Sequence, residues 1–193
     1  MISPFSVESS SSFSVASMTS GSGGGVHVLS PRKVPESLAT RRIGIVTAEF
    51  NALITSRLEE GAIHQLLKAG LSPSQLYVCK VPGAVELPMA AQWMIQTQKL
   101  HAVIALGCVI QGDTDHYDYV CQSVTQGLSQ VSLQTNCPAL MGVLTVDTLE
   151  QALQRVGGKG GNKGAEVAQA ALEMSMLYCA LTHEASVHSA ESL

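Results

Sequence analysis

The sequence predicts one α/β domain, a three-layer α/β/α sandwich with a four-stranded parallel sheet. From residue 42 onward, four short apolar runs alternate with segments in which apolar residues follow the period of a helix. Strands that alternate with helices favour a parallel sheet with right-handed crossovers. The chain has 193 residues, of which 46% are apolar and 13% charged, so one sizeable core can be buried.

The strands are expected at residues 43–47, 76–81, 102–110 and 139–145. The third run is apolar at nearly every position, which is typical of a parallel strand covered on both faces. Ligands of such sheets bind beyond the carboxyl ends of the strands. A site is therefore expected among residues 49–51, 82–86, 111–116 and the end of the fourth strand near Thr145.

The helices follow from the apolar period between these runs. Ile54, Leu58, Ala62 and Leu66 recur every four residues, and Gly70 ends the pattern. Further helices are expected at residues 87–97, at 118–135, from a capping-box-like start at Asp147 and Glu150 to about residue 156, and from the glycine-rich segment to about residue 181.

The two ends of the chain differ from this domain, which is expected at residues 41–182. Residues 1–40 are rich in serine and glycine and have no apolar period, so we expect disorder there. A serine-rich, acid-poor leader is typical of a plastid transit peptide, but no Lys or Arg precedes Arg32, so a plain tail or a mis-assigned start site is an equal alternative. Residues 183–193 are expected to form a flexible tail.

Composition argues against several classes of protein. The net charge is −4 and the chain has no run of Lys or Arg, which argues against a nucleic-acid surface. Apolar stretches such as residues 102–106 are too short to cross a bilayer. The cysteine count is odd and no C-x-x-C pair occurs, which favours free thiols in a reducing compartment for Cys79, Cys108, Cys121, Cys137 and Cys179.

The segment 111–116 after the third strand carries the most distinctive chemistry. Gly112 permits close approach of the backbone to a ligand, and the following helix start offers N–H groups to an anion. Thr114 adds a hydroxyl, and His116 adds an imidazole that can transfer protons. These residues favour a phosphorylated substrate and acid–base chemistry, while a solvated surface loop is the plain alternative. A hard-metal cluster of acidic side chains here is disfavoured, because no second ligand group stands out.

Three other segments have weaker signals. Glu86 either compensates a helix dipole or accepts hydrogen bonds from the N–H groups of a heterocycle. Phe50, at the end of the first strand, is either a rim residue or a stacking platform for a planar ligand. The glycine-rich segment 157–164 is not a P-loop. It is either a flexible connection or a lysine-bearing loop near a phosphate, supported by Arg155.

Taken together and in order, these segments resemble the lumazine synthase family. The chain carries F-N-x-x-I-T from Phe50, V-P-G-A-x-E from Val81, G-x-V-I-x-G-x-T-x-H-[YF]-[DE]-x-V from Gly107, and G-x-x-x-G-N-K-G from Gly157 before a helix containing A-L-E-M. Four motifs in register at sheet ends form a specific pattern that covers about residues 42–177.

The resemblance implies a flavodoxin-like fold and a reaction without a metal or redox cofactor. 5-Amino-6-(D-ribitylamino)uracil would condense with 3,4-dihydroxy-2-butanone 4-phosphate to give 6,7-dimethyl-8-ribityllumazine, phosphate and water, the penultimate step of riboflavin biosynthesis. It also implies a homopentamer, or a 60-subunit capsid, with sites between subunits, and riboflavin synthase as a candidate partner. The compartment would be the cytoplasm, or a plastid if the N-terminal segment is a transit peptide.

The resemblance also implies roles for particular residues. His116 would transfer protons. The pyrimidine and its ribityl chain would contact Phe50, Ala84, Val85, Glu86, Cys108, Val109, Ile110 and Met141. The phosphate would contact Asp113, Thr114, Arg155 and Lys163. Of these residues, Met141, Arg155 and Lys163 would come from the neighbouring subunit.

The chain departs from the family pattern at three positions. Gln111 replaces a common Arg or Lys, while Val85 and Met141 replace common aromatic residues, which puts substrate affinity in doubt more than reaction type. Two rival hypotheses remain at this point. One is a flavin-binding module without catalysis, which His116 and Arg155 argue against. The other is a structural shell protein, which does not exclude catalysis.

Overall fold

The computed structural model describes the backbone of residues 38–190 and the side chains up to Thr182. The predicted disordered or targeting segment lies outside these residues, except for Leu38–Thr40, which form a 3₁₀ turn (η2). This turn precedes the predicted domain boundary at residue 41. Gln75 fastens this turn, because its side-chain amide donates to the carbonyl oxygens of Leu38 and Arg41 at 2.6 and 2.7 Å.

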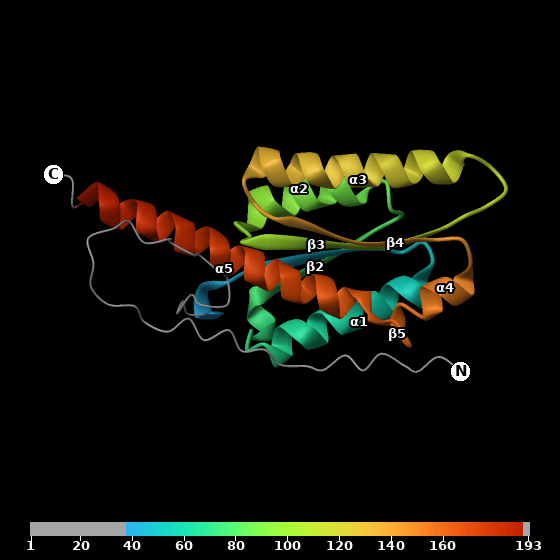
Figure 1. Cartoon of the computed structure of the whole chain (residues 1–193), viewed down its shortest axis with the longest axis horizontal. Helices are drawn as coiled ribbons and strands as arrows, with labels where there is room; N and C mark the ends of the chain where they lie inside the picture. Colours follow the sequence, from blue (N-terminus) through green and yellow to red (C-terminus); the bar gives the residue numbers. More distant parts are fainter. Residues whose placement is uncertain (1–37, 191–193) are drawn as a thin grey trace, which may run out of the picture.

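The predicted three-layer sandwich is confirmed, with the strand order β2-β1-β3-β4 and every pair parallel. The strands are β1 (Ile43–Ala48), β2 (Leu76–Val81), β3 (Ala102–Ile110) and β4 (Ala139–Val146). In Figure 1, one face of the sheet is covered by α2 (Leu87–Gln98) and α3 (His116–Thr135). The other face is covered by α1 (Ala52–Lys68), α4 (Leu149–Leu153) and α5 (Lys163–Ala190).

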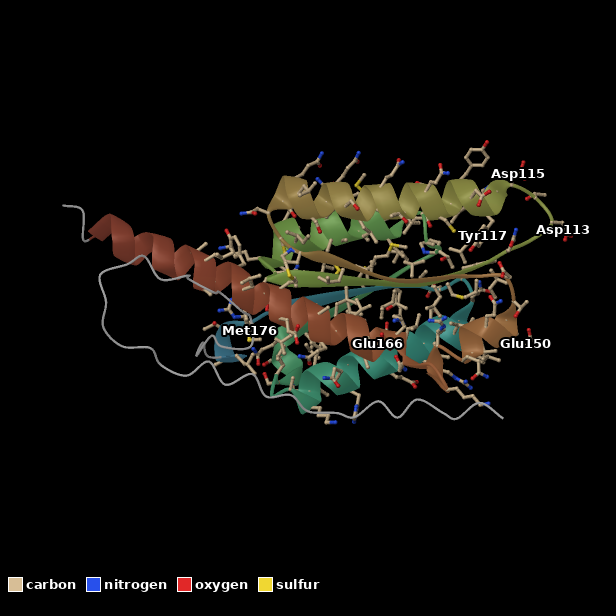
Figure 2. The ribbon with its side chains drawn as sticks, viewed as in Figure 1. Asp113, Asp115, Tyr117, Glu150, Glu166 and Met176 are labelled. Carbon is tan, nitrogen blue, oxygen red and sulfur yellow. The ribbon has the colours of Figure 1, made fainter. Side chains whose placement is uncertain are left out.

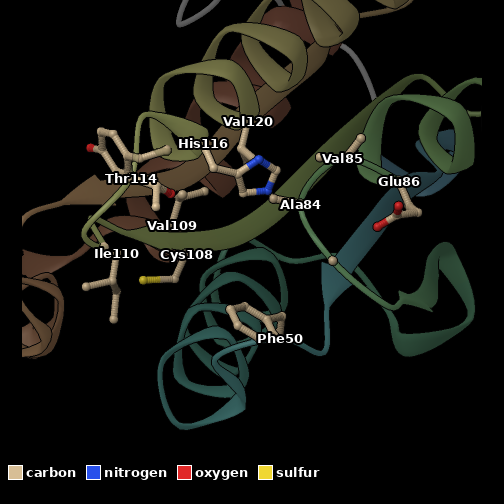
Figure 3. Close-up of a pocket in the computed structure, with 13 residues that line it drawn as sticks. Phe50, Ala84, Val85, Glu86, Cys108, Val109, Ile110, Thr114, His116 and Val120 are labelled. Carbon is tan, nitrogen blue, oxygen red and sulfur yellow. The ribbon is translucent and has the colours of Figure 1, made fainter.

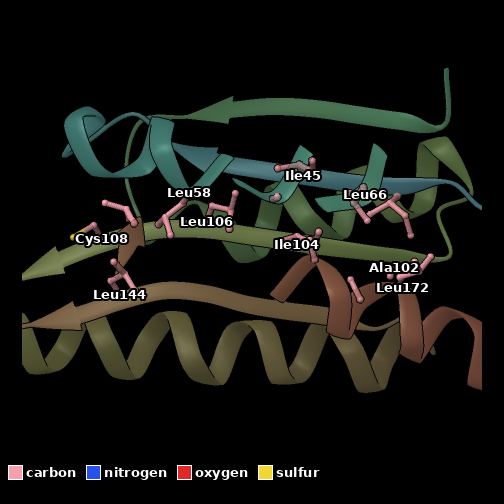
Figure 4. Packing of buried hydrophobic residues seen from close by; sticks show 14 of the residues in the cluster. Ile45, Leu58, Leu66, Ala102, Ile104, Leu106, Cys108, Leu144 and Leu172 are labelled. Carbon is pink, nitrogen blue, oxygen red and sulfur yellow. The ribbon is translucent and has the colours of Figure 1, made fainter. Parts of the chain in front are cut away.

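The central strands contribute side chains to two hydrophobic cores, one on each side of the sheet. On β3, Ile104 and Leu106 pack toward α1 and α5, while Val103 and Ala105 pack toward α2 and α3. This alternation follows from the two-residue period of a strand, and it explains why the run is apolar throughout. Figure 4 shows the first cluster, in which Leu58 of α1 meets the sheet. Burying each such side chain contributes about 1.5–3 kcal/mol.

The G-N-K-G motif holds α5 against α1. The Asn162 side chain donates to the carbonyl oxygen of Arg57 at 3.0 Å and accepts from the backbone N–H of Ala165 at 3.2 Å. It therefore caps α5 and ties that helix to α1. Gly164 lies directly against the backbone of Leu58, where a Cβ atom would clash with the carbonyl group.

The structure corrects several predicted element boundaries. The last helix does not end near residue 181 but runs to Ala190, because no glycine or proline follows Gly164 to stop it. The glycine-rich segment is a small antiparallel hairpin of β5 (Val156–Gly158) and β6 (Gly161–Asn162) rather than a plain connection.

Two helix starts also differ from the prediction. The N-cap of α4 is Thr148 and not Asp147, since the Thr148 hydroxyl accepts from the backbone N–H of Gln151. The Gln151 side chain in turn accepts from the N–H of Asp147 at 2.8 Å. Helix α3 begins at His116, two residues before the predicted start at Asp118, so the imidazole belongs to a helical turn and not to a loop.

The cysteines are free thiols, as predicted, with Cys108 and Cys137 buried. Within residues 38–190, no helix is both long and apolar enough to cross a membrane.

Gly164→Ala tests the close approach of α5 to α1. Alanine would gain about 1 kcal/mol in helix propensity, but its methyl group would meet backbone that cannot rotate away. We expect a net loss of about 2 kcal/mol in the free energy of unfolding, measured by urea denaturation. Gly112→Ala is the matched control, because nothing lies within 4 Å of a Cβ at that position. Equal stability of Gly164→Ala and the unmodified protein would contradict this packing.

His101 makes stability depend on pH. Its Nδ1 accepts from the backbone N–H of Arg42 at 3.1 Å. Burial, followed by the positive charges of Arg41 and Arg42, holds the pKa of His101 below its ordinary value of 6.5. The unfolded chain therefore binds a proton more tightly, so the contribution to stability is complete above about pH 6.5 and is lost as the pH falls through the folded pKa.

His101→Asn keeps an acceptor for the Arg42 N–H but removes the titration. Urea unfolding at pH 7.5 and at pH 5.5 should show a smaller loss of stability in this variant than in the unmodified protein. An identical loss in both proteins would show that His101 does not contribute to the acid sensitivity.

Candidate active site

The candidate site lies where the chain connections of the sheet change sides. Strands β1 and β3 are neighbours, but the chain leaves β1 toward α1 on one face and leaves β3 toward α3 on the other. A crevice opens at the carboxyl ends of two such strands, and ligands of open α/β sheets bind there. A cavity of about 340 Å³ occupies this crevice, which is large enough for a small ligand.

The cavity walls come from four separate segments (Figure 3). Strand β3 provides Cys108, Val109 and Ile110, and the loop before α2 provides Gly83 to Glu86. Phe50 stands at the end of β1, across the cavity from the helix α3. The remaining wall is formed by Gly112, Thr114, His116, Tyr117 and Val120. Nine residues of the predicted site are thus brought together: Phe50, Ala84, Val85, Glu86, Cys108, Val109, Ile110, Thr114 and His116.

Asn51 stabilises the turn between β1 and α1 that carries Phe50. It has a left-handed backbone, with φ of 60°, which turns the chain from β1 into α1. Its side-chain amide donates to the carbonyl oxygen of Cys108 at 2.9 Å, bridging the ends of β1 and β3. The backbone N–H of Phe50 donates to the carbonyl oxygen of Pro82 at 3.0 Å. This turn is therefore bonded to the ends of β3 and β2, although the Phe50 side chain is 71% exposed.

Glu86 lies at the start of α2 with its carboxylate folded back over Gly83. A Cβ atom at Gly83 would lie 3.1 Å from Oε2 of Glu86, so the glycine leaves room for this arrangement. An exposed carboxylate at a cavity wall accepts hydrogen bonds and donates none. It suits a ligand that presents N–H groups.

His116 is the first residue of α3, next to the N-cap residue Asp115. Its ring extends from the helix toward the loop that carries Ala84 and Val85 (Figure 3). The N–H groups of the first helical turn have no intrahelical partners and favour an anion nearby. The arrangement therefore combines an imidazole that can move a proton with a helix end that can hold a phosphate.

Cys108 is a wall residue and not a nucleophile. The residue is buried, and this burial raises the pKa of its thiol to about 11. At neutral pH the sulfur stays protonated and uncharged, so it contributes an apolar surface to the cavity.

Sequence reasoning assigned no role to two residues of the cavity wall, Tyr117 and Val120, whereas Gly83 and Gly112 lie in the loops where the site was expected. Tyr117 is the more informative of these two. Its side chain lies near Thr145 of β4 and Cys121 of α3. Burial raises the pKa of Tyr117, so the phenol keeps its proton. Its place directly after His116 in the sequence motif was the available signal.

Four predicted site residues do not line this cavity: Asp113, Met141, Arg155 and Lys163. Asp113 lies on the exposed loop that projects beyond the sheet (Figure 2). Met141 is 37% exposed on β4. The hairpin holds Arg155 and Lys163 together, because the N–H of Lys163 donates to the carbonyl oxygen of Arg155 at 2.8 Å, and the Lys163 ammonium pairs with Glu166.

The acidic loop does not form a metal centre. In the described part of the chain, no three His, Cys, Asp or Glu side chains are grouped closely enough to hold a metal ion.

Comparison with known proteins identifies the family of this chain. The family model of 6,7-dimethyl-8-ribityllumazine synthase matches residues 40–178. A protein of Cytophaga hutchinsonii named 6,7-dimethyl-8-ribityllumazine synthase is 49% identical over 138 residues, which cover 72% of this chain and 87% of that relative. The matched region contains the whole sheet and every residue of the cavity wall. The chain therefore belongs to the 6,7-dimethyl-8-ribityllumazine synthase family.

Proposed function

We propose that this chain is a transferase of riboflavin biosynthesis that condenses 5-amino-6-(D-ribitylamino)uracil with 3,4-dihydroxy-2-butanone 4-phosphate. The products are 6,7-dimethyl-8-ribityllumazine, phosphate and water. The observation that carries the proposal is one cavity in which an aromatic ring, a carboxylate and an imidazole at a helix start, Phe50, Glu86 and His116, share the same walls.

The pyrimidine occupies the part of the cavity between Phe50 and the loop before α2. The Phe50 ring stacks on the planar heterocycle, and the Glu86 carboxylate accepts hydrogen bonds from its N–H groups. The ribityl chain extends along the remaining wall, formed by Ala84, Val85, Cys108, Val109 and Ile110.

The butanone phosphate binds at the start of α3. The Thr114 hydroxyl, the Asp113 backbone and the N–H groups of the first helical turn contact the phosphate oxygens. A charged ligand at this position needs compensation that this chain's own cavity does not supply, since the Gln111 side chain is neutral. The proposal therefore includes Arg155 and Lys163 as phosphate ligands from a neighbouring subunit.

His116 moves the protons that the reaction requires. The amine of the pyrimidine attacks the ketone, a first water leaves as an imine forms, and phosphate is eliminated. The ribityl-bearing amine then attacks the remaining carbonyl carbon, and loss of a second water closes the lumazine ring. A well-placed acid–base group contributes about 10²- to 10⁴-fold to such steps. Holding two substrates together supplies much of the remaining acceleration.

We also propose a homopentamer with each site shared between adjacent subunits. The support is that Met141, Arg155 and Lys163 are outside this chain's cavity, while the Phe50 rim is largely exposed. Residues 41–182 would form the catalytic unit, and the cytoplasm is the proposed compartment. Light scattering separates a pentamer of 20.3 kDa chains from a closed 60-subunit capsid.

His116→Ala tests the proposed function. The purified protein is mixed with both substrates, and lumazine fluorescence is followed. We expect clear product from the unmodified protein and a rate loss of about 100-fold or more in the variant, because proton transfer loses its acid–base group. His64→Ala is the matched control, because His64 is exposed on α1 and outside this cavity; its rate should equal that of the unmodified protein.

An unmodified protein that binds both substrates without forming product would overturn the enzyme assignment. A yellow preparation with tightly bound flavin and no product would instead favour a flavin-binding module.

A further inference from the structure

Strand β2 leads into one wall of the cavity but lies at the edge of the sheet. Among the described strands it pairs with β1 alone, and Val81 is its only buried residue. The chain runs from Val81 into Pro82 and then into the wall formed by Gly83 to Glu86. The position of this wall relative to the opposite wall, Phe50, therefore depends on how firmly the end of β2 is fixed to β1.

Backbone hydrogen bonds continue between the two chain segments up to the cavity itself. Beyond the end of β1, the N–H of Glu49 donates to the Val81 carbonyl oxygen at 2.8 Å, and that of Phe50 donates to Pro82 at 3.0 Å. The adjacent Asn51 is bonded to β3. Because Phe50 stays with β3, loosening of β2 would move its loop away from Phe50 instead of moving both walls together.

Three polar side chains join β2 to β1 and α1 just before this point. Thr47 of β1 and Lys80 of β2 are register partners, and Glu59 of α1 contacts both. The Glu59 Oε2 atom accepts from the Lys80 ammonium at 2.7 Å and from the Thr47 hydroxyl at 2.5 Å. The Glu59 side chain is 16% exposed and that of Lys80 43%, while Thr47 is buried. Among the described residues, Lys80 makes the one hydrogen bond from a β2 side chain to another element.

We propose that Lys80, Glu59 and Thr47 form a positioning network that fixes the end of β2, and with it residues 83–86, at the distance from Phe50 that the pyrimidine requires. The inference rests on the proposed binding of the pyrimidine between these two walls. The buried Thr47 hydroxyl orients the Glu59 carboxylate, and this carboxylate holds Lys80 and its strand. Because small displacements of binding groups weaken their contacts with a ligand, the network has a measurable effect on substrate affinity.

Lys80→Met keeps an apolar stem but removes the ion pair. We expect KM for the pyrimidine to rise about three- to fivefold, the range of one partly exposed ion pair. The turnover number kcat and KM for the butanone phosphate should change by less than about twofold, because the phosphate binds at the start of α3, which follows β3 and not β2. Lys80→Arg keeps the pair with Glu59 and should restore KM. Lys68→Met is the matched control, because it removes the same charge from the exposed last turn of α1; its KM values should be unchanged.

Glu59→Met tests whether Lys80 acts through the carboxylate. It should raise KM for the pyrimidine at least as much as Lys80→Met does. The double variant should show no increase beyond that of Glu59→Met, because the two residues belong to one network. Additive increases would overturn the inference. An unchanged KM for the pyrimidine in Lys80→Met, or equal rises in KM for both substrates, would do the same.

Amide hydrogen exchange keeps this test separate from the test of the proposed function, because it needs no turnover. The N–H groups of Glu49 and Phe50 report on the bonds to Val81 and Pro82. We expect these amides and those of residues 83–86 to exchange faster in Lys80→Met but not in Lys80→Arg or Lys68→Met, while the amides of β3 stay unchanged.

If the unmodified protein forms no lumazine, the proposed function fails, but hydrogen exchange still decides the positioning. Unchanged exchange in Lys80→Met would overturn the inference. Equally faster exchange throughout the sheet would also overturn it, because it would show a general loss of stability and not a local effect on the end of β2.

Discussion

The site depends on the parallel pairing of β1 with β3, two neighbouring strands whose chain connections leave on opposite faces of the sheet. This arrangement keeps the ends of both strands uncovered, so Phe50 and the loop before α3 meet across one crevice. The hydrogen bond from Asn51 to the Cys108 carbonyl bridges the two strand ends. The turn that carries Phe50 is thereby fixed to the buried strand β3.

Some residues of the family motifs line the cavity, whereas others form the turns and helix contacts that hold the fold together. In F-N-x-x-I-T, Phe50 faces the cavity, whereas Asn51 builds the turn that presents it. In G-x-x-x-G-N-K-G, Asn162 and Gly164 join α5 to α1. The proposed phosphate ligand Lys163 lies between these two residues, at the first position of α5. The G-x-x-x-G-N-K-G motif therefore mainly packs α5 against α1, and it places the proposed phosphate ligand at the start of α5.

Most of the fold could be predicted from the sequence, because hydrophobic period and glycine placement are local signals. The run from Ala102 to Ile110 had to be a covered strand, and β3 has those bounds. These signals failed where one particular hydrogen bond or strand pairing sets the boundary of an element. The cap of α4 is chosen by Gln151, and the hairpin forms through the pairing of Val156 with Asn162. Tyr117 was overlooked because only the packing of α3 against the sheet brings it to the cavity wall.

The most direct measurement mixes two variants that should each have lost most of their activity, His116→Ala and Arg155→Ala, after joint unfolding and reassembly. If each site takes His116 from one subunit and Arg155 from its neighbour, random assembly restores both residues in about a quarter of the sites. We expect the rate of lumazine formation in the mixture to be well above that of either variant alone. A mixture as inactive as its components, in oligomers that contain both chains, would contradict the shared site.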